Sequence, residues 1–445
     1  MEDWTKNVTY YPDIVHPLMK EKSELKLKYV MRLVEYANKF GEKNLIDINI
    51  LNILYSLFGD INDIQEKYKE CKKVNNLADN SSPFRIFSYR YVFLFDCLLL
   101  FAVDDMEKGM MICEELKKHV HGRYHKRIDS MVSKMYKGSD DFATNTLISK
   151  EMIKSWLNAR QYVNTNNHDI VFTATMSAGK STLINAIIGS DLSGAKKAAC
   201  TSQVIRFHSI PIKSDFYTIT DNNNCCYMQN INNIHQLVRQ HDNGHEIICY
   251  FRSKLNSGRY TLIDTPGVNS SQNPQHKKIT RNTLVNNVGT LVYVIPVESY
   301  GSTDDYEHLQ YILKKANYER ILFVINMIDN IDTEDDSVEE IMFNVREHLE
   351  QIGFSDPEIY PISAKAGLQL KQMLSGVPLT QNEKISAQNY IRVFSQPEYA
   401  LAKYYSFCYK DEKELNYWPF IKKNKKIWNA YINTGLPGFE NALLG

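Results

Sequence analysis

The stretch DIVFTATMSAGKSTLINAIIG, residues 169–189, constrains the fold of this chain more than any other segment. An apolar, β-branched run breaks into small residues, reaches Gly-Lys-Ser, and continues in a pattern that favours a helix. Residues 174–181 follow the phosphate-loop pattern, with Ala174 in place of its first glycine. The pattern predicts a strand, a phosphate-binding loop and a helix, whereas the alternative is an ordinary strand-to-helix turn.

The physical basis of this prediction is the anion site that a helix N-terminus provides. Backbone N–H groups from Ser177 to Thr182 are expected to point into one concavity, where the helix dipole also favours an anion. We expect Lys180 to reach the β- and γ-phosphates and the Ser181 hydroxyl to ligate Mg²⁺. The residues predicted to contact the nucleotide in this loop are Met176, Ala178, Gly179, Lys180, Ser181 and Thr182.

A second motif, Asp-Thr-Pro-Gly at residues 264–267, closes the strand-like run RYTLID. We expect Asp264 to hold Mg²⁺, usually through water, and the amide of Gly267 to turn toward a γ-phosphate. Because Pro and Gly favour turns, a simple β-turn is the alternative for this tetrapeptide. The tetrapeptide follows a phosphate loop in the sequence and lies at the end of a predicted strand, and this position favours a role in binding Mg²⁺.

A third motif bears on the choice of base. The run ILFVINMIDN holds Asn326, which we expect to contact the nucleotide, and ends near Asp329. The carboxylate of Asp329 can accept two hydrogen bonds from the guanine N1–H and amino group, a pair that adenine does not offer. Met327 stands where lysine is usual, so a thioether takes the place of an aliphatic stem with its ammonium. Guanine is therefore the predicted base.

Two further segments complete the set. The tripeptide at residues 363–365 is expected to cap the guanine O6 through its backbone, and it consists of Ser363, Ala364 and Lys365. Lys365 is also expected to lie over the sugar or base. In KKAACTSQVIRF we expect the Thr201 hydroxyl to complete the Mg²⁺ coordination and its backbone to position the attacking water, with Ser202 and Thr218 as alternatives. Five elements in this order predict a GTP-binding domain.

The rest of the chain divides in two by its hydrophobic pattern. Residues 1–165 show apolar residues three and four apart without strand-like alternation, which predicts a helical bundle or a set of helical hairpins. From residue 166 short β-branched runs alternate with helical ones, as in α/β folds. Residues 166–445 are therefore expected to form an α/β P-loop GTPase domain, with a mainly parallel central sheet covered by helices and C-terminal return helices. The insertion at residues 215–253 is expected to add antiparallel strands at one edge.

Composition limits the partners and the location. Lys+Arg and Asp+Glu are 52 each, so no net charge attracts nucleic acid, and no nucleic-acid partner is expected. The eight cysteines lack C-x-x-C spacing, which is typical of reduced thiols in a cytoplasmic protein. The most apolar run, residues 91–103, contains Asp96 and is too short to span a bilayer, so it predicts a buried helix. Any membrane contact is then peripheral, at the inner face of a membrane.

The loop MSAGKST resembles the phosphate loop of the dynamin superfamily. The segments CTS before a strand, DTPG, and TGLPGFENAL before a helix are similar to those of bacterial dynamin-like GTPases, over roughly residues 166–445. The resemblance implies GTP hydrolysis to GDP and phosphate in a homodimer that forms across the nucleotide face. It also implies that residues 1–165 are neck-like helices that move in membrane remodelling or protection. A second dynamin-like chain is a further partner that the resemblance implies.

The resemblance extends to single residues. Ser177 matches the family's phosphate-loop serine, which neutralises charge between the β- and γ-phosphates, sometimes with a bound monovalent cation. Met176 stands where eukaryotic dynamins often have a catalytic glutamine, so catalysis here relies on Thr201, the switch backbone and a partner subunit, or is slow. The residues expected to act in catalysis are Ser177, Lys180, Thr201 and Gly267.

Other interpretations stay open at this point. A nucleotide-gated scaffold with weak hydrolysis fits Met176 and Met327, and a regulatory GTPase of ribosome or RNA assembly shares the same nucleotide motifs. The segment YWPFIKKNKKIWNAY, residues 417–431, resembles a membrane-interface patch, but a helix with one solvated lysine face is the preferred interpretation. The closing NTGLPGFENALLG reads as the start of a helix, which favours a truncated chain.

Overall fold

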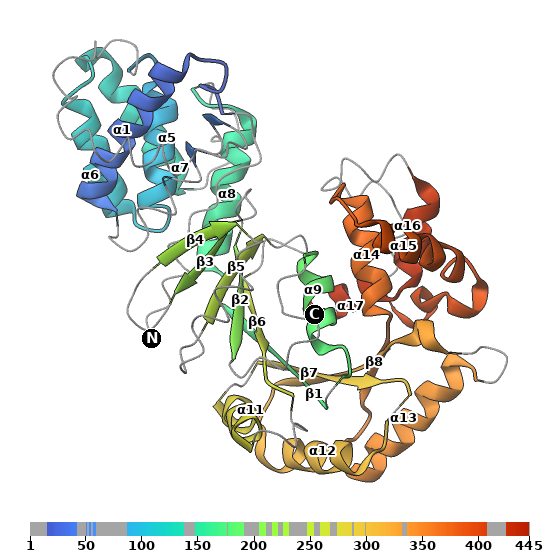
Figure 1. The fold of residues 1–445 in the computed structure, drawn as a ribbon. Helices are drawn as coiled ribbons and strands as arrows, with labels where there is room; N and C mark the ends of the chain where they lie inside the picture. The colour runs from blue at the N-terminus through green and yellow to red at the C-terminus, as the bar shows by residue number, and fades with distance from the viewer. Residues whose placement is uncertain are drawn as a thin grey trace.

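A group of helices precedes an α/β unit along the chain, and α8 (Lys150–Asn164) leads from one to the other (Figure 1). The computed structural model describes residues 16–41, 50, 53–54, 57–58, 87–137, 147–175, 177–190, 204–210, 216–220, 226–230, 247–252, 259–267, 274–286, 289–298, 300–331, 336–406 and 424–444.

The N-terminal helices pack around one apolar cluster of buried side chains. Besides α8 they are α1 (Ser23–Phe40), α5 (Arg90–Phe101), α6 (Met106–Lys117) and α7 (His125–Lys137). Helix α5 is buried from Phe93 to Phe101, as its apolar sequence predicts. Its carboxylate, Asp96, accepts a hydrogen bond of 2.6 Å from Tyr29 and lies 3.0 Å from Nε2 of His16, so this buried charge is partnered. Within the described ranges, no helix has the length and hydropathy needed to traverse a bilayer.

A seven-stranded sheet forms the centre of the α/β unit, in the order β5-β2-β6-β1-β7-β8-β9. The strands are β1 (His168–Ala174), β2 (Ile205–Ile210), β5 (Ile247–Arg252), β6 (Tyr260–Asp264), β7 (Thr290–Pro296), β8 (Arg320–Asn326) and β9 (Glu358–Pro361). Neighbouring strands run parallel except for β2 and β6. The predicted mainly parallel sheet is confirmed.

The insertion behaves differently from the prediction. Among the described strands, β3 (Phe216–Thr220) and β4 (Cys226–Asn230) pair only with each other, as a separate antiparallel ribbon. Strand β5 does join the sheet edge, but it runs parallel to β2. Residues 253–259 are too few for the crossover that parallel strands require, so β6 runs opposite to β5. The antiparallel pair in the main sheet is therefore β2 with β6, outside the insertion.

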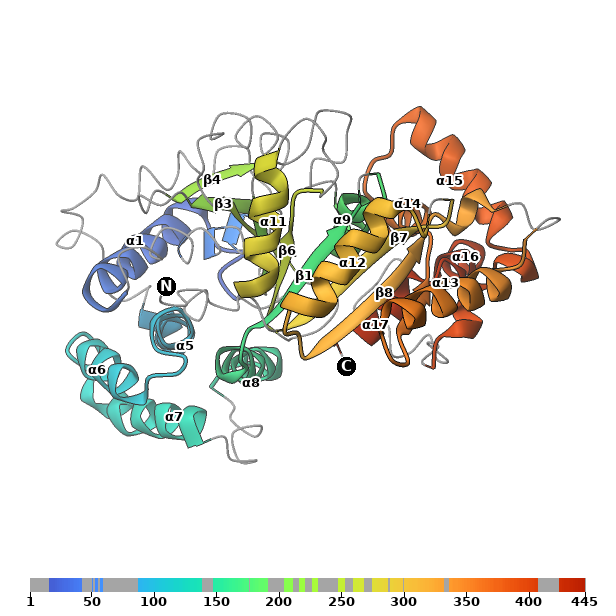
Figure 2. The same cartoon turned by 90° about the horizontal axis from the view of Figure 1, so that it is seen from below.

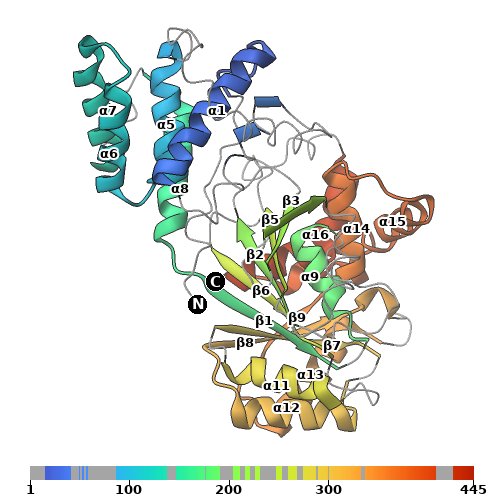
Figure 3. The same cartoon turned by 60° about the vertical axis from the view of Figure 1, so that its left-hand side comes forward.

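Helices cover both faces of the sheet. One face carries α9 (Lys180–Ile188), α14 (Ala364–Leu374), α16 (Lys425–Asn433) and α17 (Leu436–Leu444), beside α15 (Gln381–Val393) (Figures 1 and 3). The other face carries α11 (Pro274–Asn286), α12 (Thr303–Lys315) and α13 (Val338–Ile352), and Figure 2 views the molecule from that side. Because both faces are covered, β6 and β7 are buried at every residue.

The helical group contacts the α/β unit through the end of α8. The Tyr162 hydroxyl donates to the carbonyl oxygen of Ser209 in β2 at 2.8 Å. Arg259, just before β6, donates to the carbonyl oxygen of Thr165 at 3.4 Å. Buried apolar side chains form one cluster up to Val163 and another from Ile170 onward. The predicted domain boundary between residues 165 and 166 remains a prediction.

Candidate nucleotide-binding site

The loop between β1 and α9 has a backbone that ordinary residues rarely adopt. Ser177 and Gly179 have φ values of 65° and 81°, and α9 begins at Lys180. A Cβ atom at Gly179 would lie 2.3 Å from Nδ2 of Asn326, a separation too short for any side chain. The same Nδ2 donates a hydrogen bond of 3.0 Å to the carbonyl oxygen of Ala178. Glycine is therefore required where the end of β8 holds the loop.

Two loop side chains converge on one carboxylate. The ammonium of Lys180 forms an ion pair with Oδ1 of Asp264, and both side chains are buried. The Ser181 hydroxyl donates to Oδ2 of Asp264 at 3.3 Å. Lys180 and Ser181 open α9, whereas Asp264 ends β6, so the group lies at the carboxyl ends of parallel strands. In open α/β sheets this edge is where ligands bind.

The donor set at this point fits Mg²⁺. A hydroxyl and a carboxylate are hard oxygen ligands, and Mg²⁺ in nucleotide sites takes one or two protein ligands besides phosphates and water. Ser181 and Asp264 supply such a pair within hydrogen-bond distance of each other. Among the described residues no group of three or more His, Cys, Asp or Glu side chains could hold a metal. The structure therefore offers Ser181 and Asp264 as the residues that would bind Mg²⁺.

The Asp-Thr-Pro-Gly segment is held on both sides. The Thr265 hydroxyl, fully buried, donates to the carbonyl oxygen of Phe172 in β1 at 2.7 Å. The Thr280 hydroxyl in α11 donates to the carbonyl oxygen of Pro266 at 2.7 Å. Gly267 follows and is partly exposed. The segment thus links the strand that leads into the phosphate loop with the helix that follows it in sequence.

The residues assigned to base recognition also lie together. The Ser363 hydroxyl donates to Oδ1 of Asp329 at 2.5 Å, and the backbone amide of Ala364 donates to Oδ1 of Asn326 at 3.0 Å. The amide of Ser363 donates to the carbonyl oxygen of Thr434 at 3.0 Å. The amides of Ser363 and Ala364 are thus engaged inside the protein, whereas Lys365 is exposed on the first turn of α14.

Tyr390 in α15 is a site residue that the sequence did not reveal. Burial raises the pKa of its phenol, and the neighbouring Asp329 carboxylate, which shares a hydrogen bond with it, raises that pKa further. The phenol therefore stays protonated and donates to Asp329, the residue assigned to guanine. Tyr390 lies in an amphipathic helix without a motif, so no pattern in the sequence distinguishes it from a core tyrosine.

Lys371 is a second residue that sequence reasoning missed. Its side chain is 1% exposed, and its ammonium donates to the carbonyl oxygens of Ala186 and Ile187 at 2.9 and 2.8 Å. A third bond, of 2.5 Å, goes to Oε1 of Glu440 in α17. Ala186 and Ile187 lie in the last turn of α9, where orphan carbonyls and the helix dipole favour a cation. Lys371 therefore ties the helix of the phosphate loop to α17.

Some predicted site residues lie outside the described part of the chain. They are Met176, Thr201 and its alternative Ser202, whereas Thr218 falls in β3 and Thr182 in the first turn of α9. The aromatic and lysine segment at 417–431 is described from residue 424. There, Trp428 and Tyr431 are each 4% exposed, while Lys425 and Lys426 face solvent. This part matches the preferred interpretation of a packed helix with a solvated lysine face.

Comparison with known proteins identifies one family. Residues 170–328 match the dynamin family, a range that runs from β1 to just before Asp329. No curated protein matches the chain. The structure of Era from Aquifex aeolicus bound to GDP and aluminium fluoride is 17% identical, with a TM-score of 0.30; the match covers 48% of this chain and 58% of Era. The chain thus spans about three fifths of Era.

Two structures of an oligomerised bacterial dynamin pair, described as sensing and tethering membranes over long range, also match. One is 13% identical, with a TM-score of 0.37, and the match covers 88% of this chain and 62% of that chain. The other is 16% identical, with a TM-score of 0.36, over 85% of this chain and 71% of that chain.

Proposed function

From the dynamin-family domain that residues 170–328 form, we propose that this chain binds GTP with Mg²⁺ and hydrolyses it to GDP and phosphate. The observation that carries the proposal is the convergence of Lys180 and Ser181 on Asp264 at the carboxyl edge of the sheet. A cation and a hydroxyl on a helix N-terminus, facing a carboxylate on the next strand, are the groups that phosphoryl transfer requires.

Each residue has a definite part in this mechanism. The Lys180 ammonium neutralises charge on the β- and γ-phosphates, and the backbone amides of residues 177–182 bind phosphate oxygens. Ser181 and Asp264 would hold Mg²⁺, which would supply positive charge to the phosphate groups. The Gly267 amide faces the γ-phosphate, and Thr201 orients the attacking water. Ser177 neutralises charge between the β- and γ-phosphates, in some states together with a monovalent cation.

The base is read at the other end of the site. Asp329 accepts the N1–H and amino group of guanine, and Ser363 and Tyr390 orient its carboxylate. Lys365, exposed at the start of α14, covers the sugar or base and partly replaces the ammonium that Met327 lacks. Asn326 acts indirectly, because its amide bridges Ala178 in the phosphate loop and Ala364 in α14.

The family membership of the domain supports a wider proposal. We propose a homodimer across the nucleotide face that stimulates hydrolysis, and peripheral action at the inner face of a membrane in remodelling or protection, with a second dynamin-like chain as partner. The N-terminal helices, joined by α8, are the part proposed to move when the nucleotide changes.

The test is GTP turnover per molecule against protein concentration, with Mg²⁺ and with either Na⁺ or K⁺. A specific rate that rises with concentration is expected from a homodimer across the nucleotide face. Lys180→Ala should abolish GTP binding, while Lys425→Ala, at an exposed lysine of α16, serves as the matched control. A specific GTPase rate that does not change with protein concentration would exclude stimulation by a dimer. GTP binding without turnover would favour the nucleotide-gated scaffold. Unchanged GTP binding by Lys180→Ala would refute the proposed nucleotide-binding site.

A further inference from the structure

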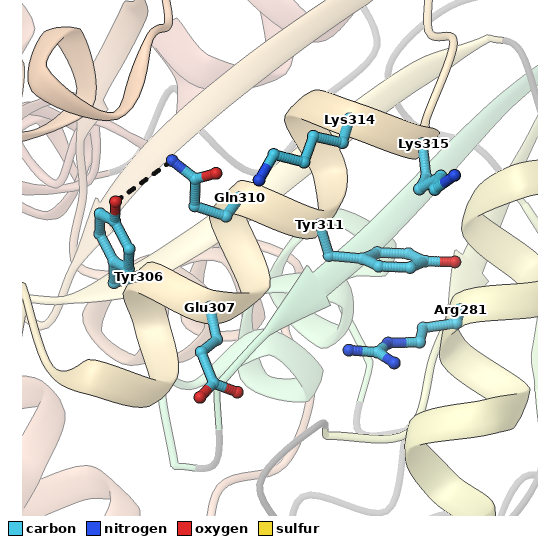
Figure 4. A pocket seen from close by; sticks show the side chains of 7 residues that line it. All are labelled: Arg281, Tyr306, Glu307, Gln310, Tyr311, Lys314 and Lys315. Carbon is cyan, nitrogen blue, oxygen red and sulfur yellow. Dashed lines mark hydrogen bonds between the residues drawn. The ribbon is translucent and has the colours of Figure 1, made fainter.

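An open groove lies between α11 and α12, on the face of the sheet opposite α9, and the cavity that it encloses has a volume of about 460 Å³. Figure 4 shows the side chains around it, which come from one residue of α11 and one side of α12. Those used below are Arg281, Tyr306, Glu307, Tyr311, Lys314 and Lys315. None of them belongs to the nucleotide site, so the cavity is a separate feature of the domain.

The two helices lie alongside each other in a regular register. The ammonium of Lys277 lies 3.6 Å from Oε2 of Glu307, and the Arg281 guanidinium lies 4.4 Å from the centre of the Tyr311 ring. The second pair lies one helical turn beyond the first on both helices. On α12 the lining residues run from Tyr306 to Lys315, so the cavity follows this helix to its C-terminal end.

The charge around the cavity is positive. Its single carboxylate, Glu307, is already paired with Lys277, and α11 contains no Asp or Glu. The basic residues that remain are Arg281, Lys314 and Lys315. In Figure 4 the Arg281 guanidinium lies beneath the Tyr311 ring and faces the space between the helices. A carboxylate entering this space would meet three cations and one compensated anion.

Arg281 also has one donor that the protein leaves without a partner. Its Nε is buried, and among the described residues it has no hydrogen-bond acceptor. Buried donors in folded proteins are nearly always satisfied, so a donor without a partner calls for an explanation. The guanidinium is a planar fork that matches a carboxylate, and its stacking on Tyr311 fixes the plane of that fork.

The size and the lining favour a peptide over a small anion. Ligand cavities commonly measure roughly 300–1,000 Å³, and this one falls in that range. Tyr306, which lines the cavity, is 47% exposed, so an apolar contact accompanies the cations. A polyphosphate would meet the Glu307 carboxylate and gain little from the apolar margin. An acidic segment with apolar side chains uses both features.

Both walls of the cavity are attached to the nucleotide site. Thr280, next to Arg281, donates to the carbonyl oxygen of Pro266 in the Asp-Thr-Pro-Gly segment at 2.7 Å. His308, next to Glu307, contacts the Thr173 hydroxyl in β1 through Nε2 at 2.9 Å. Strand β1 leads directly into the phosphate loop. A shift in either segment therefore changes the separation or orientation of Arg281 and Tyr311.

We infer that the groove between α11 and α12 binds an acidic peptide segment of a partner protein, and that the bound nucleotide alters its affinity. The second part rests on the proposed GTP binding, whereas the first part does not. The groove thus gives the domain a docking site for a protein whose recruitment depends on the nucleotide.

The test begins with a random twelve-residue peptide library displayed on phage and selected on the full chain. Selected peptides are expected to combine Asp or Glu with apolar residues. Their affinity, measured by fluorescence anisotropy, should fall about tenfold in Arg281→Gln because a charge-assisted bidentate contact is lost. The affinity should also fall in Lys315→Gln, a substitution at an exposed residue that disturbs packing less. It should not change in Lys384→Gln, at an exposed lysine of α15. Thermal melting checks that each variant is folded.

The controls separate the possible sources of failure. Selected peptides without acidic residues would refute the proposal that the groove binds an acidic peptide. Equal peptide affinity of Arg281→Gln and the wild type would refute it as well. Displacement of the peptide by millimolar inorganic phosphate or by RNA would assign the site to phosphate groups instead. Equal peptide affinity with GDP and with a non-hydrolysable GTP analogue would refute the coupling alone. A separate nucleotide titration shows whether GTP binding itself has failed.

Discussion

Replacing Lys371 by methionine should destabilise the α/β unit far more than an ordinary lysine substitution. The ammonium is 1% exposed and makes three short contacts, with the Glu440 carboxylate and with two carbonyl oxygens at the C-terminus of α9. Methionine keeps the length of the side chain but removes the charge and all donors. The Glu440 carboxylate, 4% exposed, then loses this counter-ion inside the core.

The magnitude follows from burial. Removing one partner of a buried ion pair costs about 3–5 kcal/mol of unfolding free energy, because the other charge stays buried. The double variant Lys371→Met/Glu440→Leu removes both charges and should lose only about 1–2 kcal/mol, the contribution of a cation at the C-terminus of a helix. The single and double variants are therefore expected to be strongly non-additive.

Urea denaturation of the wild type, Lys371→Met, Glu440→Leu and the double variant gives the coupling energy. Lys403→Met is the matched control, because Lys403 forms an exposed pair with Glu339, with side chains 46% and 58% exposed. Such a surface pair contributes about 0–1 kcal/mol. A loss below about 1 kcal/mol for Lys371→Met, equal to that of the control, would refute the argument. Additive effects of the two single substitutions would refute it as well.

Three further predictions concern the nucleotide site and its support. Gly179→Ala places a Cβ atom 2.3 Å from Nδ2 of Asn326 at a φ of 81°, so GTP affinity in a nucleotide titration should fall at least about tenfold while circular dichroism is retained. Unchanged affinity would show that the loop can adapt. Asp329→Asn replaces one acceptor by a donor, so the preference for GTP over ATP should fall about tenfold or more in competition binding. A constant preference would locate base recognition elsewhere. For His308, burial, with help from Arg281 and Lys277, lowers the pKa from 6.5 to about 3. The unfolded chain then binds more protons between these values, so stability should fall with falling pH by up to about 1.4 kcal/mol per unit, and His308→Gln should reduce that slope in urea titrations at several pH values.

The parts of the site that are contiguous in sequence were predictable. The loop at residues 174–181 places the small residues Ser177, Ala178 and Gly179 directly before Lys180, and Asp264 ends a strand-like run, so pattern alone indicates both. The sheet was predictable because alternating strands and helices allow few arrangements. The antiparallel direction of β2 relative to β6 was not predictable. It depends on the short connection between β5 and β6 rather than on any property of β2 itself.

The residues that sequence reasoning missed share a physical reason. Lys371 and Tyr390 lie far along the chain from the residues they contact, in helices whose sequences look like ordinary amphipathic surfaces. A lysine in a helix is normally solvated, so only the fold reveals that Lys371 is buried against α9. Asn326 was assigned to the nucleotide from its motif, and its observed bonds to Ala178 and Ala364 required the meeting of three separate segments.

These contacts hold the helix of the phosphate loop at both ends. At its N-terminus, Lys180 contacts Asp264; at its C-terminus, the last carbonyls bind Lys371, which also binds Glu440. A Cβ atom at Gly367 would lie 2.7 Å from Cδ2 of Leu436, so the Leu436 side chain of α17 packs directly against the backbone of α14. A rigid contact of this kind does not absorb motion. Any displacement of α9 that accompanies nucleotide exchange must therefore either carry α17 with it or break the ion pair between Lys371 and Glu440.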